Sequence, residues 1–533
     1  NIPIWDSWKS VFPLIIKIFY LHKSLSWHDL VQINVSHRVI ITRLIFLADY
    51  YLFSGSRYIV LLLCFCFQLG TFLLVITRFY TVCKRKEIKW WFISFIIATL
   101  IFSPRGSANW TWAFASVQQI LSVFFILCAI ALLSTRFNFL FKIVLILIFS
   151  LLATASSANG LLVWPIMVLG LILQKRNWKV ILFYAVVGTI IIIFYMQGHF
   201  YITAMTPGSG GLLFWQYILY ALAFLGASFS SLSPYVVLAL GALIFIIFLC
   251  IYADCICKFF TNKLDDELLL IVLLSLFALC SAIMAAWGRL TFPGHFEKAF
   301  QSRYIPFQSL APIAAIIYFI LLLKKQLFQK LIITVLILIL TITSIISYPK
   351  NLGVDQVLAR QITLLALQNN ILTQYNRVIN FSNYLILDQI KQAKKYELFG
   401  IGTKTMINKS ISENKMHIIN ESTNINSMPL FKAGLKKGKN VNHADQIKAA
   451  GFIPGYQREI YLSNSFNEYN HLFIIHNSII VGKGQRTKNL LGNKNTWGIF
   501  WTDYKQNSTP ALICFSKDNV NLICKYRFEY KIK

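Results

Sequence analysis

The first candidate for chemistry is Asp6, which stands between two tryptophans in Ile4-Trp5-Asp6-Ser7-Trp8. Tryptophan is enriched at membrane surfaces, and a carboxylate held between two such rings is partly desolvated. Desolvation raises the pKa of a carboxyl group, which makes it a usable general base near neutral pH. The alternative is a tryptophan belt with an incidental aspartate, and the motif alone favours neither.

Several arginines are candidate ligands for phosphate, because a guanidinium binds phosphate through charge-assisted hydrogen bonds. The pair His37-Arg38 stands at the head of an apolar stretch, where it could equally anchor the chain at a membrane surface. Arg289 and the pair Arg303-Tyr304 bound a second short segment, which also carries Lys298. If this segment lies outside the cytoplasm, where positive residues are depleted, its charges predict an anionic partner.

Two polar breaks between apolar runs are candidates for binding a sugar or a lipid head group. Asn109-Trp110 offers a ring for stacking and an amide for hydroxyl groups, although a polar turn between helices explains it as well. The segment Ser156-Ser157-Ala158-Asn159-Gly160 interrupts two apolar runs. Polar backbone at membrane depth is tolerated only against protein or a wet cavity, so Asn159 predicts a cavity near the membrane surface.

The ten cysteines include no CxxC pair and no Cys/His cluster with zinc spacing. Cys514 and Cys524 flank the turn-forming segment 516–519. A hairpin centred near Asn519 would place them opposite each other on one face, close enough for a disulfide. Two small side chains packed under a sheet are the other interpretation of the same pattern.

The elements that must position these residues are membrane helices. The chain has 533 residues, 57% of them hydrophobic and only 13% charged, too few charges for the surface of a soluble protein of this length. Apolar runs long enough for membrane crossings are predicted at 58–82, 90–103, 114–133, 140–155, 161–174, 180–197, 235–257, 268–287, 305–323 and 331–348.

The net charge of +30 indicates topology rather than nucleic-acid binding, because the basic residues recur between apolar runs. Basic clusters at 84–89, 136–142, 175–179, 258–263 and 324–330 all fall on one side if the ten runs cross. The positive-inside rule makes this side the cytoplasm. The outer loops are then 1–57, 104–113, 156–160, 198–234 and 288–304, within which 38–55 and 217–232 are expected to be interfacial or re-entrant helices.

A change of composition after Tyr348-Pro349 marks the end of a membrane domain over 1–348 and the start of a soluble outer domain over 349–533. Its first part, about 355–396, has helical periodicity. From about Phe452 onward, short apolar runs separated by Gly, Asn and Lys predict strands. The fold class is therefore mainly α, a polytopic transmembrane bundle, with a C-terminal extracytoplasmic α+β domain that forms a small β-sandwich.

The order of these motifs over about residues 1–330 resembles a group of bacterial polytopic proteins related to the GT-C superfamily of membrane glycosyltransferases. The resemblance implies an inverting enzyme of the bacterial inner membrane that moves a sugar from a polyprenyl-phosphate donor to a glycan or lipid acceptor of the cell envelope. It also implies that Asp6 is the general base that deprotonates the acceptor.

The resemblance further implies how the other candidates divide. It implies that the donor phosphate is bound by Arg303, together with Arg289, Arg38, His37 and Tyr304. It implies that the sugar or lipid cavity is lined by Trp5, Asn109, Trp110 and Asn159. The group commonly shows His-Asn-Glu-His-Arg where this chain has Asn34-Val35-Ser36-His37-Arg38. This chain lacks the glutamate of a carboxylate-dependent metal site, so the metal ligands are unknown and the need for a divalent ion stays open.

Two other functions would need the same kinds of residues. An O-antigen polymerase or ligase also acts on polyprenyl-linked glycans, but it usually carries a long outer loop between two late spans. A lipid-linked glycan transporter needs polar residues near the middle of its spans, whereas here the polar groups gather at the outer ends. The pattern favours the glycosyltransferase over both.

The charge pattern makes a direct prediction about sidedness. A reporter active only outside the cytoplasm should give signal when fused after Lys533 and none when fused near Lys325. The reverse pair of results would place Asp6 on the cytoplasmic face and contradict the topology.

Overall fold

The computed structural model describes most of residues 10–351 and the regular elements of the C-terminal part. The described residues are 7, 10–34, 37–85, 90–135, 137–197, 214–289, 296–322, 326–351, 364–368, 371–373, 384–396, 398, 417–418, 430–435, 453–462, 471–476, 479–487, 495–502, 511–516 and 521–532. Trp5 and Asp6 lie outside them.

The chain divides into two compact units. Unit 2 is Ser24–Leu352, and unit 1 combines Asn1–Lys23 with Gly353–Lys533. The sequence analysis expected residues 1–23 to belong with the membrane domain. They group with the C-terminal part instead, and the Tyr20 ring lies 5.0 Å from the Tyr396 ring, centroid to centroid.

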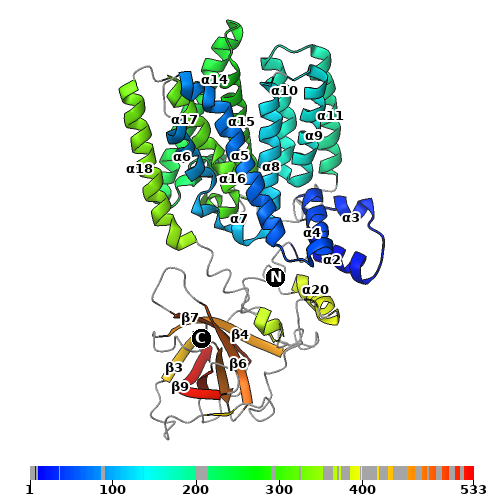
Figure 1. The fold of residues 1–533 in the computed structure, drawn as a ribbon, viewed down its shortest axis with the longest axis vertical. Helices are drawn as coiled ribbons and strands as arrows, with labels where there is room; N and C mark the ends of the chain where they lie inside the picture. Colours follow the sequence, from blue (N-terminus) through cyan, green and yellow to red (C-terminus); the bar gives the residue numbers. More distant parts are fainter. Residues whose placement is uncertain are drawn as a thin grey trace. The chain divides into compact units, whose positions relative to one another are not determined.

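Unit 2 is a bundle of apolar helices (Figure 1), and among the residues that the structure describes, eight spans are long and apolar enough to cross a membrane. These spans are built from α5 (Tyr58–Arg85), α6 (Trp90–Ile101), α8 (Ala113–Leu133), α9 (Phe139–Ser156), α11 (Trp178–Met196), α14 (Pro234–Phe260), α15 (Asp266–Arg289) and α17 (Leu310–Leu322). The chain is therefore a multi-pass membrane protein, as predicted.

The other two predicted crossings are also helical. They correspond to α10 (Val163–Leu173) and α18 (Gln326–Asn351), whose apolar described stretches, Ala158–Leu173 and Ile333–Ser347, are shorter. Within the bundle α8 is central, with 89% of its span buried, whereas only 17% of the α11 span is buried. Because α11 is apolar on all sides, its exposed face is suited to lipid.

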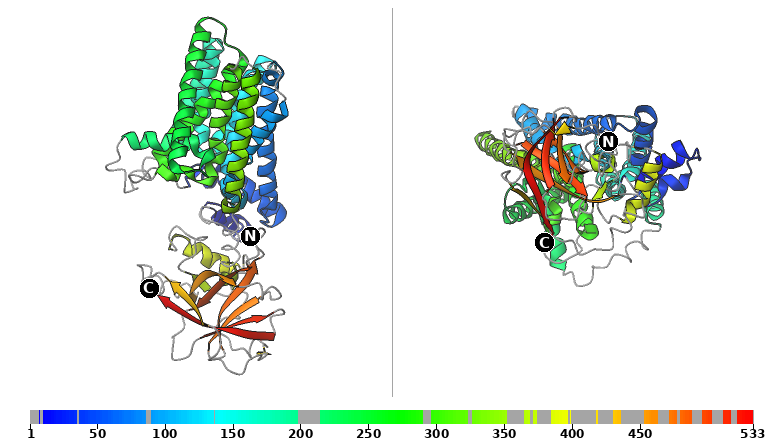
Figure 2. Two further views of the ribbon diagram at one scale, coloured as in Figure 1. Left: turned by 90° about the vertical axis from the view of Figure 1, so that its left-hand side faces the viewer. Right: turned by 90° about the horizontal axis from the view of Figure 1, so that it is seen from below.

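The helices run side by side (Figure 2), so their connections gather at two ends. At one end, called here the basic end (residues 134–138, 174–177 and 261–265), the Gln174 amide donates to the Leu133 carbonyl at 3.0 Å. The Lys175 ammonium there donates to the Asn262 amide oxygen. At the opposite end, called here the site end (residues 102–112, 227–233 and 296–304), the Asn109 amide donates to the Ser302 carbonyl at 3.4 Å.

The segment expected to be interfacial, 217–232, forms α13 (Phe214–Gly226) and the 3₁₀ turn η4 (Ala227–Phe229). A Cβ atom on Gly241 of α14 would lie 1.9 Å from the Leu222 carbonyl oxygen, and one on Gly226 would lie 2.1 Å from that of Val237. Only glycine allows this approach. Since Tyr217 also contacts Trp287 near the end of α15, both halves of α13 lie at the site end.

The chain enters and leaves unit 2 at the site end. Near the entrance, α4 (Ile40–Phe53) is preceded by Arg38, which bonds to the carbonyls of Tyr195 and Gln197 where α11 ends. Near the exit, α18 packs against α6 and against the turn η2 (Pro104–Gly106). Both connections to unit 1 therefore start from the end that carries the polar loops.

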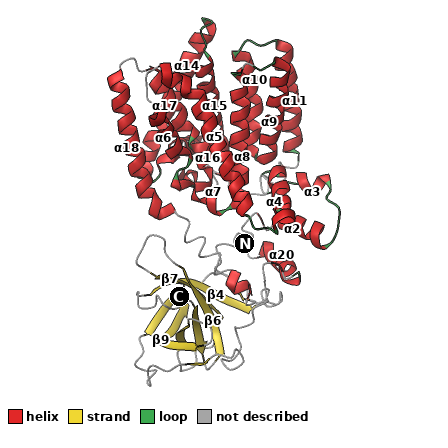
Figure 3. Cartoon of the chain, in the orientation of Figure 1, coloured by secondary structure: helices red, strands yellow, loops and turns green. Residues whose placement is uncertain are grey.

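Unit 1 combines short helices with strands (Figure 3). Its helices include α2 (Phe12–Ile15), the π-helix η1 (Ile16–Tyr20) and α20 (Tyr384–Lys395). The strands are β1 (Ile371–Thr373), β2 (His417–Ile418), β3 (Leu430–Leu435), β4 (Ile453–Leu462), β5 (His471–His476), β6 (Ile479–Thr487), β7 (Asn495–Thr502), β8 (Ala511–Ser516) and β9 (Asn521–Ile532).

The strands follow the order β1-β4-β7-β6-β5-β8-β9-β2, with β3 also paired to β9. From β4 to β9 the neighbours are antiparallel. A division into two packed sheets stays a prediction. The predicted hairpin is confirmed in its register: Cys514 lies opposite Cys524 across β8 and β9. Cys514 is buried and disulfide-bonded.

Candidate functional site

Two loops singled out in the sequence meet at the site end although they lie about 190 residues apart. One contains η2 and α7 (Ser107–Thr111), and the other is the turn η6 (Ser302–Tyr304). The Asn109 amide donates to Ser302, as described above, and a Cβ atom on Gly106 would make an ordinary contact with Ile305 at 3.6 Å. Proline at the start of a helical turn fits there because its missing N–H would be unpaired anyway, and Pro104 and Pro306 occupy such positions.

Arg303 lies between two aromatic rings. Its guanidinium carbon is 5.6 Å from the centre of the Trp112 ring and 5.1 Å from that of Tyr304. Its Nη2 donates to the Tyr304 hydroxyl at 3.3 Å, whereas its buried Nε has no hydrogen-bond partner. Within the described residues no carboxylate pairs with Arg303. Ring contacts hold the plane of a guanidinium and leave its edge for an anion.

Arg105 is a second cation at this end, and it is buried, with 6% of its surface exposed. Its Nη1 donates to the Ala227 carbonyl of η4. A guanidinium has five N–H donors, and in the described part of the chain this is the one hydrogen bond of the Arg105 side chain. Burying a guanidinium without a counter-charge is costly, so Arg105 adds to the demand for an anion at the site end.

The structure describes three of the residues predicted to line a sugar or lipid cavity, Asn109, Trp110 and Asn159, and their shared cavity stays a prediction. Asn109 is buried and keeps an amide oxygen without a hydrogen-bond partner, so it has capacity for a hydroxyl group. The half-buried Trp110 packs its ring 6.0 Å from that of Phe65 on α5. Asn159, also half-buried, lies in η3 (Ala158–Leu162), and no described hydrogen bond joins it to Asn109 or Arg303.

Arg38 lies at the site end and is bonded to the backbone where α11 ends, whereas the backbone of His37 pairs with that of Asn34. Arg38 Nε donates to the Tyr195 carbonyl at 2.8 Å, and its two terminal nitrogens donate to the carbonyls of Val31 and Gln197. Burial lowers the pKa of the Arg38 guanidinium, and the Tyr195 phenol partly offsets this. The contacts fit the anchoring interpretation; a phosphate role for Arg38 and His37 stays a prediction.

Behind Arg38, α4 buries a further arginine and an aspartate. Arg43 donates to the carbonyls of Leu30 at 2.6 Å and Gln32 at 2.7 Å, and burial lowers its pKa to about 10. Burial raises the pKa of Asp49, and the backbone N–H of Arg57, 3.3 Å away, offsets only part of this. These bonds join residues within the segment before α5 and stabilise its fold.

Other predicted site residues lie outside what the structure describes. These are Trp5 and Asp6, together with the side chain of Arg289, whose backbone ends α15. The described residues contain no group of three or more His, Cys, Asp or Glu side chains that could hold a metal ion.

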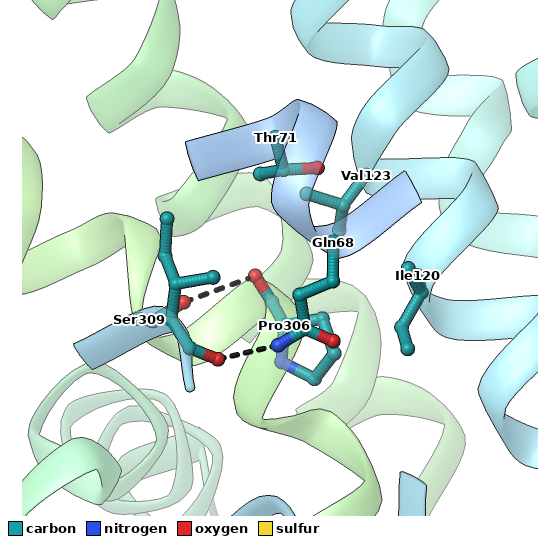
Figure 4. A pocket seen from close by; sticks show the side chains of 7 residues that line it. Gln68, Thr71, Ile120, Val123, Pro306 and Ser309 are labelled. Atoms are coloured by element: carbon teal, nitrogen blue, oxygen red, sulfur yellow. Dashed lines mark hydrogen bonds between the residues drawn. The ribbon is translucent and has the colours of Figure 1, made fainter. Parts of the chain in front are cut away.

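A small cavity lies between α5, α6, α8 and the segment Pro306 to Ser309 (Figure 4). It offers about 10 Å³ to the centre of a water molecule, room for roughly one water. The Gln68 amide donates to the carbonyl of Ile101, the last residue of α6, while its own oxygen has no hydrogen-bond partner. Gln68 thus ties α5 to the point from which the loop of Arg105 starts.

Arg105, Trp112 and Gln68 are not among the residues predicted from the sequence. Arg105 and Trp112 belong to the predicted outer loop 104–113, and Arg105 lies within the helical span Trp90–Thr111, where an arginine is a general signal of function. Gln68 gives the same kind of signal, a lone amide in the apolar run 58–82. Arg105 contacts Ala227, Trp112 contacts Arg303, and Gln68 contacts Ile101. Because each contact joins distant parts of the chain, no local sequence pattern predicts it.

Comparison of the chain with protein-family models, with curated proteins and with solved structures finds no match. The argument for function therefore depends on the geometry of the site end.

Replacing Gln68 with Leu tests the link between α5 and α6. The change leaves the buried Ile101 carbonyl without its donor, a loss of about 1–3 kcal/mol, so the melting temperature in detergent should fall by several degrees. The control is Thr77→Val, because exposed Thr77 bonds only within its own helix, to Leu73 and Leu74. Equal melting temperatures for both variants and the wild type would contradict the link.

The buried Asp49 predicts a pH dependence of stability. Its pKa is raised above the ordinary 3.8, so the folded state binds the proton more tightly than the unfolded state. The stabilisation from protonation is present at low pH and is lost as pH rises through the raised pKa. Asp49→Asn should therefore gain melting temperature relative to the wild type between pH 4 and pH 7. If the melting temperature of Asp49→Asn instead falls relative to that of the wild type as the pH rises toward 7, the ionised carboxylate stabilises the fold.

Proposed function

We propose that the chain is a membrane glycosyltransferase that moves a sugar from a polyprenyl-phosphate donor to a glycan or lipid acceptor of the cell envelope. One observation carries the proposal: the Arg303 guanidinium lies between Trp112 and Tyr304 with a buried nitrogen that has no partner. A phosphate is the anion that fits a planar cation of this kind, since it accepts two parallel hydrogen bonds.

The position of Arg303 favours a lipid-linked phosphate. Arg303 belongs to a membrane span, Ser302–Leu322, in which 78% of the residues are buried inside the protein. The site end is thus one end of an apolar bundle, where a phosphate can contact Arg303 while its lipid chain stays in the bilayer. In glycosyl transfer Arg303 would stabilise the charge that develops on the departing phosphate, and the amide oxygen of Asn109 would accept from a sugar hydroxyl.

The general base in this proposal is Asp6. It precedes Val11 and Phe12, which are buried, in the N-terminal segment that groups with the C-terminal unit. The role of Asp6 is to take the proton of the acceptor hydroxyl as that oxygen attacks the sugar carbon and the phosphate leaves.

An extracytoplasmic site is supported by the disulfide. The charge pattern of the loops assigns both the site end and residues 349–533 to the outer side in this proposal. Cys514 of unit 1 is disulfide-bonded and faces Cys524. Disulfides persist in oxidising compartments and are rare in the cytosol, which agrees with the charge pattern of the loops.

A transporter fits the bundle less well. Passage of a glycan needs polar residues near the middle of the spans, whereas the buried arginines and the polar loops described above gather at the site end. A polymerase or ligase would use the same phosphate chemistry at the site end and differs only in its acceptor.

The test is turnover by the full chain in proteoliposomes that also contain extracted cell-envelope glycans and lipids as acceptors. The donors are a panel of hexoses and pentoses linked to undecaprenyl phosphate or diphosphate, and the readout is release of the undecaprenyl phosphate or diphosphate. Asp6→Asn should lower kcat by roughly two orders of magnitude, the usual scale for a general base, with little effect on donor KM. Arg303→Lys keeps the charge but loses the planar fork, so it should raise the KM for donor more than that for acceptor.

Lys263→Gln is the control, because it removes an exposed charge at the basic end and should leave both constants unchanged. Turnover by Asp6→Asn at the wild-type rate would remove Asp6 as the base. Release from no member of the panel by the wild type would reject glycosyl transfer.

A further inference from the structure

Beside Arg303 lies a second group of polar side chains that the mechanism above leaves unused. The η4 turn and the residues after it read Ala227-Ser228-Phe229-Ser230-Ser231. The hydroxyl oxygens of Ser228, Ser230 and Ser231 are buried, and none has a hydrogen-bond partner among the described residues. Buried hydroxyls are normally hydrogen-bonded, so three in one turn indicate a group that binds there.

Arg105 is fastened to this turn. The carbonyl of Ala227 accepts from Arg105 Nη1 and, at 3.1 Å, from the backbone N–H of Ser230. The remaining N–H groups of the buried guanidinium have no hydrogen-bond acceptor in the described structure. Donors are therefore in surplus around η4, and their complement is a group rich in acceptors.

The turn is joined to Arg303 through Tyr304. The Tyr304 ring lies 6.0 Å from that of Phe224, three residues before Ala227, and its hydroxyl accepts from Arg303. The turn also reaches the surface, because Ser230 and Ser231 are half-buried and Ser233 is exposed. An anion bound at Arg303 would therefore have further hydrogen-bond donors nearby, namely the serine hydroxyls around η4 and the guanidinium of Arg105.

We propose that Arg105 with Ser228, Ser230 and Ser231 forms a second phosphate subsite, so that the chain binds a lipid diphosphate in preference to a lipid monophosphate. The proposal rests on the proposed function in assigning the first phosphate to Arg303, and it changes the donor of that reaction from a polyprenyl monophosphate sugar to a polyprenyl diphosphate sugar. Two guanidinium groups without described carboxylates match the two charged groups of a diphosphate, and the serine hydroxyls donate to its outer oxygens.

The experiment is calorimetric titration of the full chain in nanodiscs with farnesyl monophosphate and farnesyl diphosphate as probes. The wild type should bind the diphosphate roughly tenfold or more tightly than the monophosphate, the scale of one added charge-assisted contact. Arg105→Gln should narrow this ratio to about one, whereas Arg303→Gln should weaken both probes. The half-buried pair Ser230→Ala with Ser231→Ala should narrow the ratio even if Arg105→Gln does not fold.

Equal affinity of the wild type for both probes would overturn the proposal, and so would an Arg105→Gln variant that keeps the wild-type ratio. Inorganic pyrophosphate should bind far more weakly than farnesyl diphosphate, and equal binding would reject the lipid. These outcomes are independent of turnover: a chain that prefers the diphosphate but transfers no sugar would keep the subsite and lose only the proposed reaction.

Discussion

The main constraint on this structure is the free-energy cost of placing positive charge at the end of an apolar bundle. Arg105 is buried and Arg303 is held between two rings, and the described residues offer neither of them a carboxylate. An unpaired buried charge costs several kcal/mol, so the fold keeps these arginines only because other features of the site end offset the cost. Backbone carbonyls supply part of the compensation, as Ala227 does for Arg105, and an anionic ligand would supply the rest.

The helices around the two arginines are arranged so that their loops can approach. Gln68 bonds to the end of α6 just before the loop that carries Arg105 and Asn109, and the glycines of α13 and α14 bring η4 up to Arg105. Arg38 and Arg43 also stabilise this arrangement, because their guanidinium groups donate hydrogen bonds to backbone carbonyls that would otherwise be unpaired. Backbone polar groups inside a membrane must be paired within the protein, so these arginines stabilise the fold of the bundle.

The sequence predicted the membrane helices, the polar loops and the hairpin register of Cys514 and Cys524 because each has a local pattern: an apolar run, a break, or two apolar segments around a turn. Through the resemblance carried by the order of the motifs, it also assigned Asn109 and Arg303 to one site; the structure brings Asn109 to Ser302, the neighbour of Arg303, and the shared site stays a prediction. It did not predict Arg105 on Ala227 or Gln68 on Ile101, because these contacts are decided by how distant helices pack. The grouping of residues 1–23 with the C-terminal part was missed for the same reason, since the pattern at 11–20 fits an interfacial helix equally well.

The central claim is that the site end binds the phosphate of a lipid-linked sugar through Arg303. Its most direct test is an experimental structure of the full chain in nanodiscs with an undecaprenyl-phosphate sugar bound. The account predicts a phosphate within hydrogen-bonding distance of the Arg303 guanidinium, beside the Trp112 ring, with the lipid chain leaving along the bundle. A head group bound instead at the basic end, near Lys175 and Arg176, would contradict it.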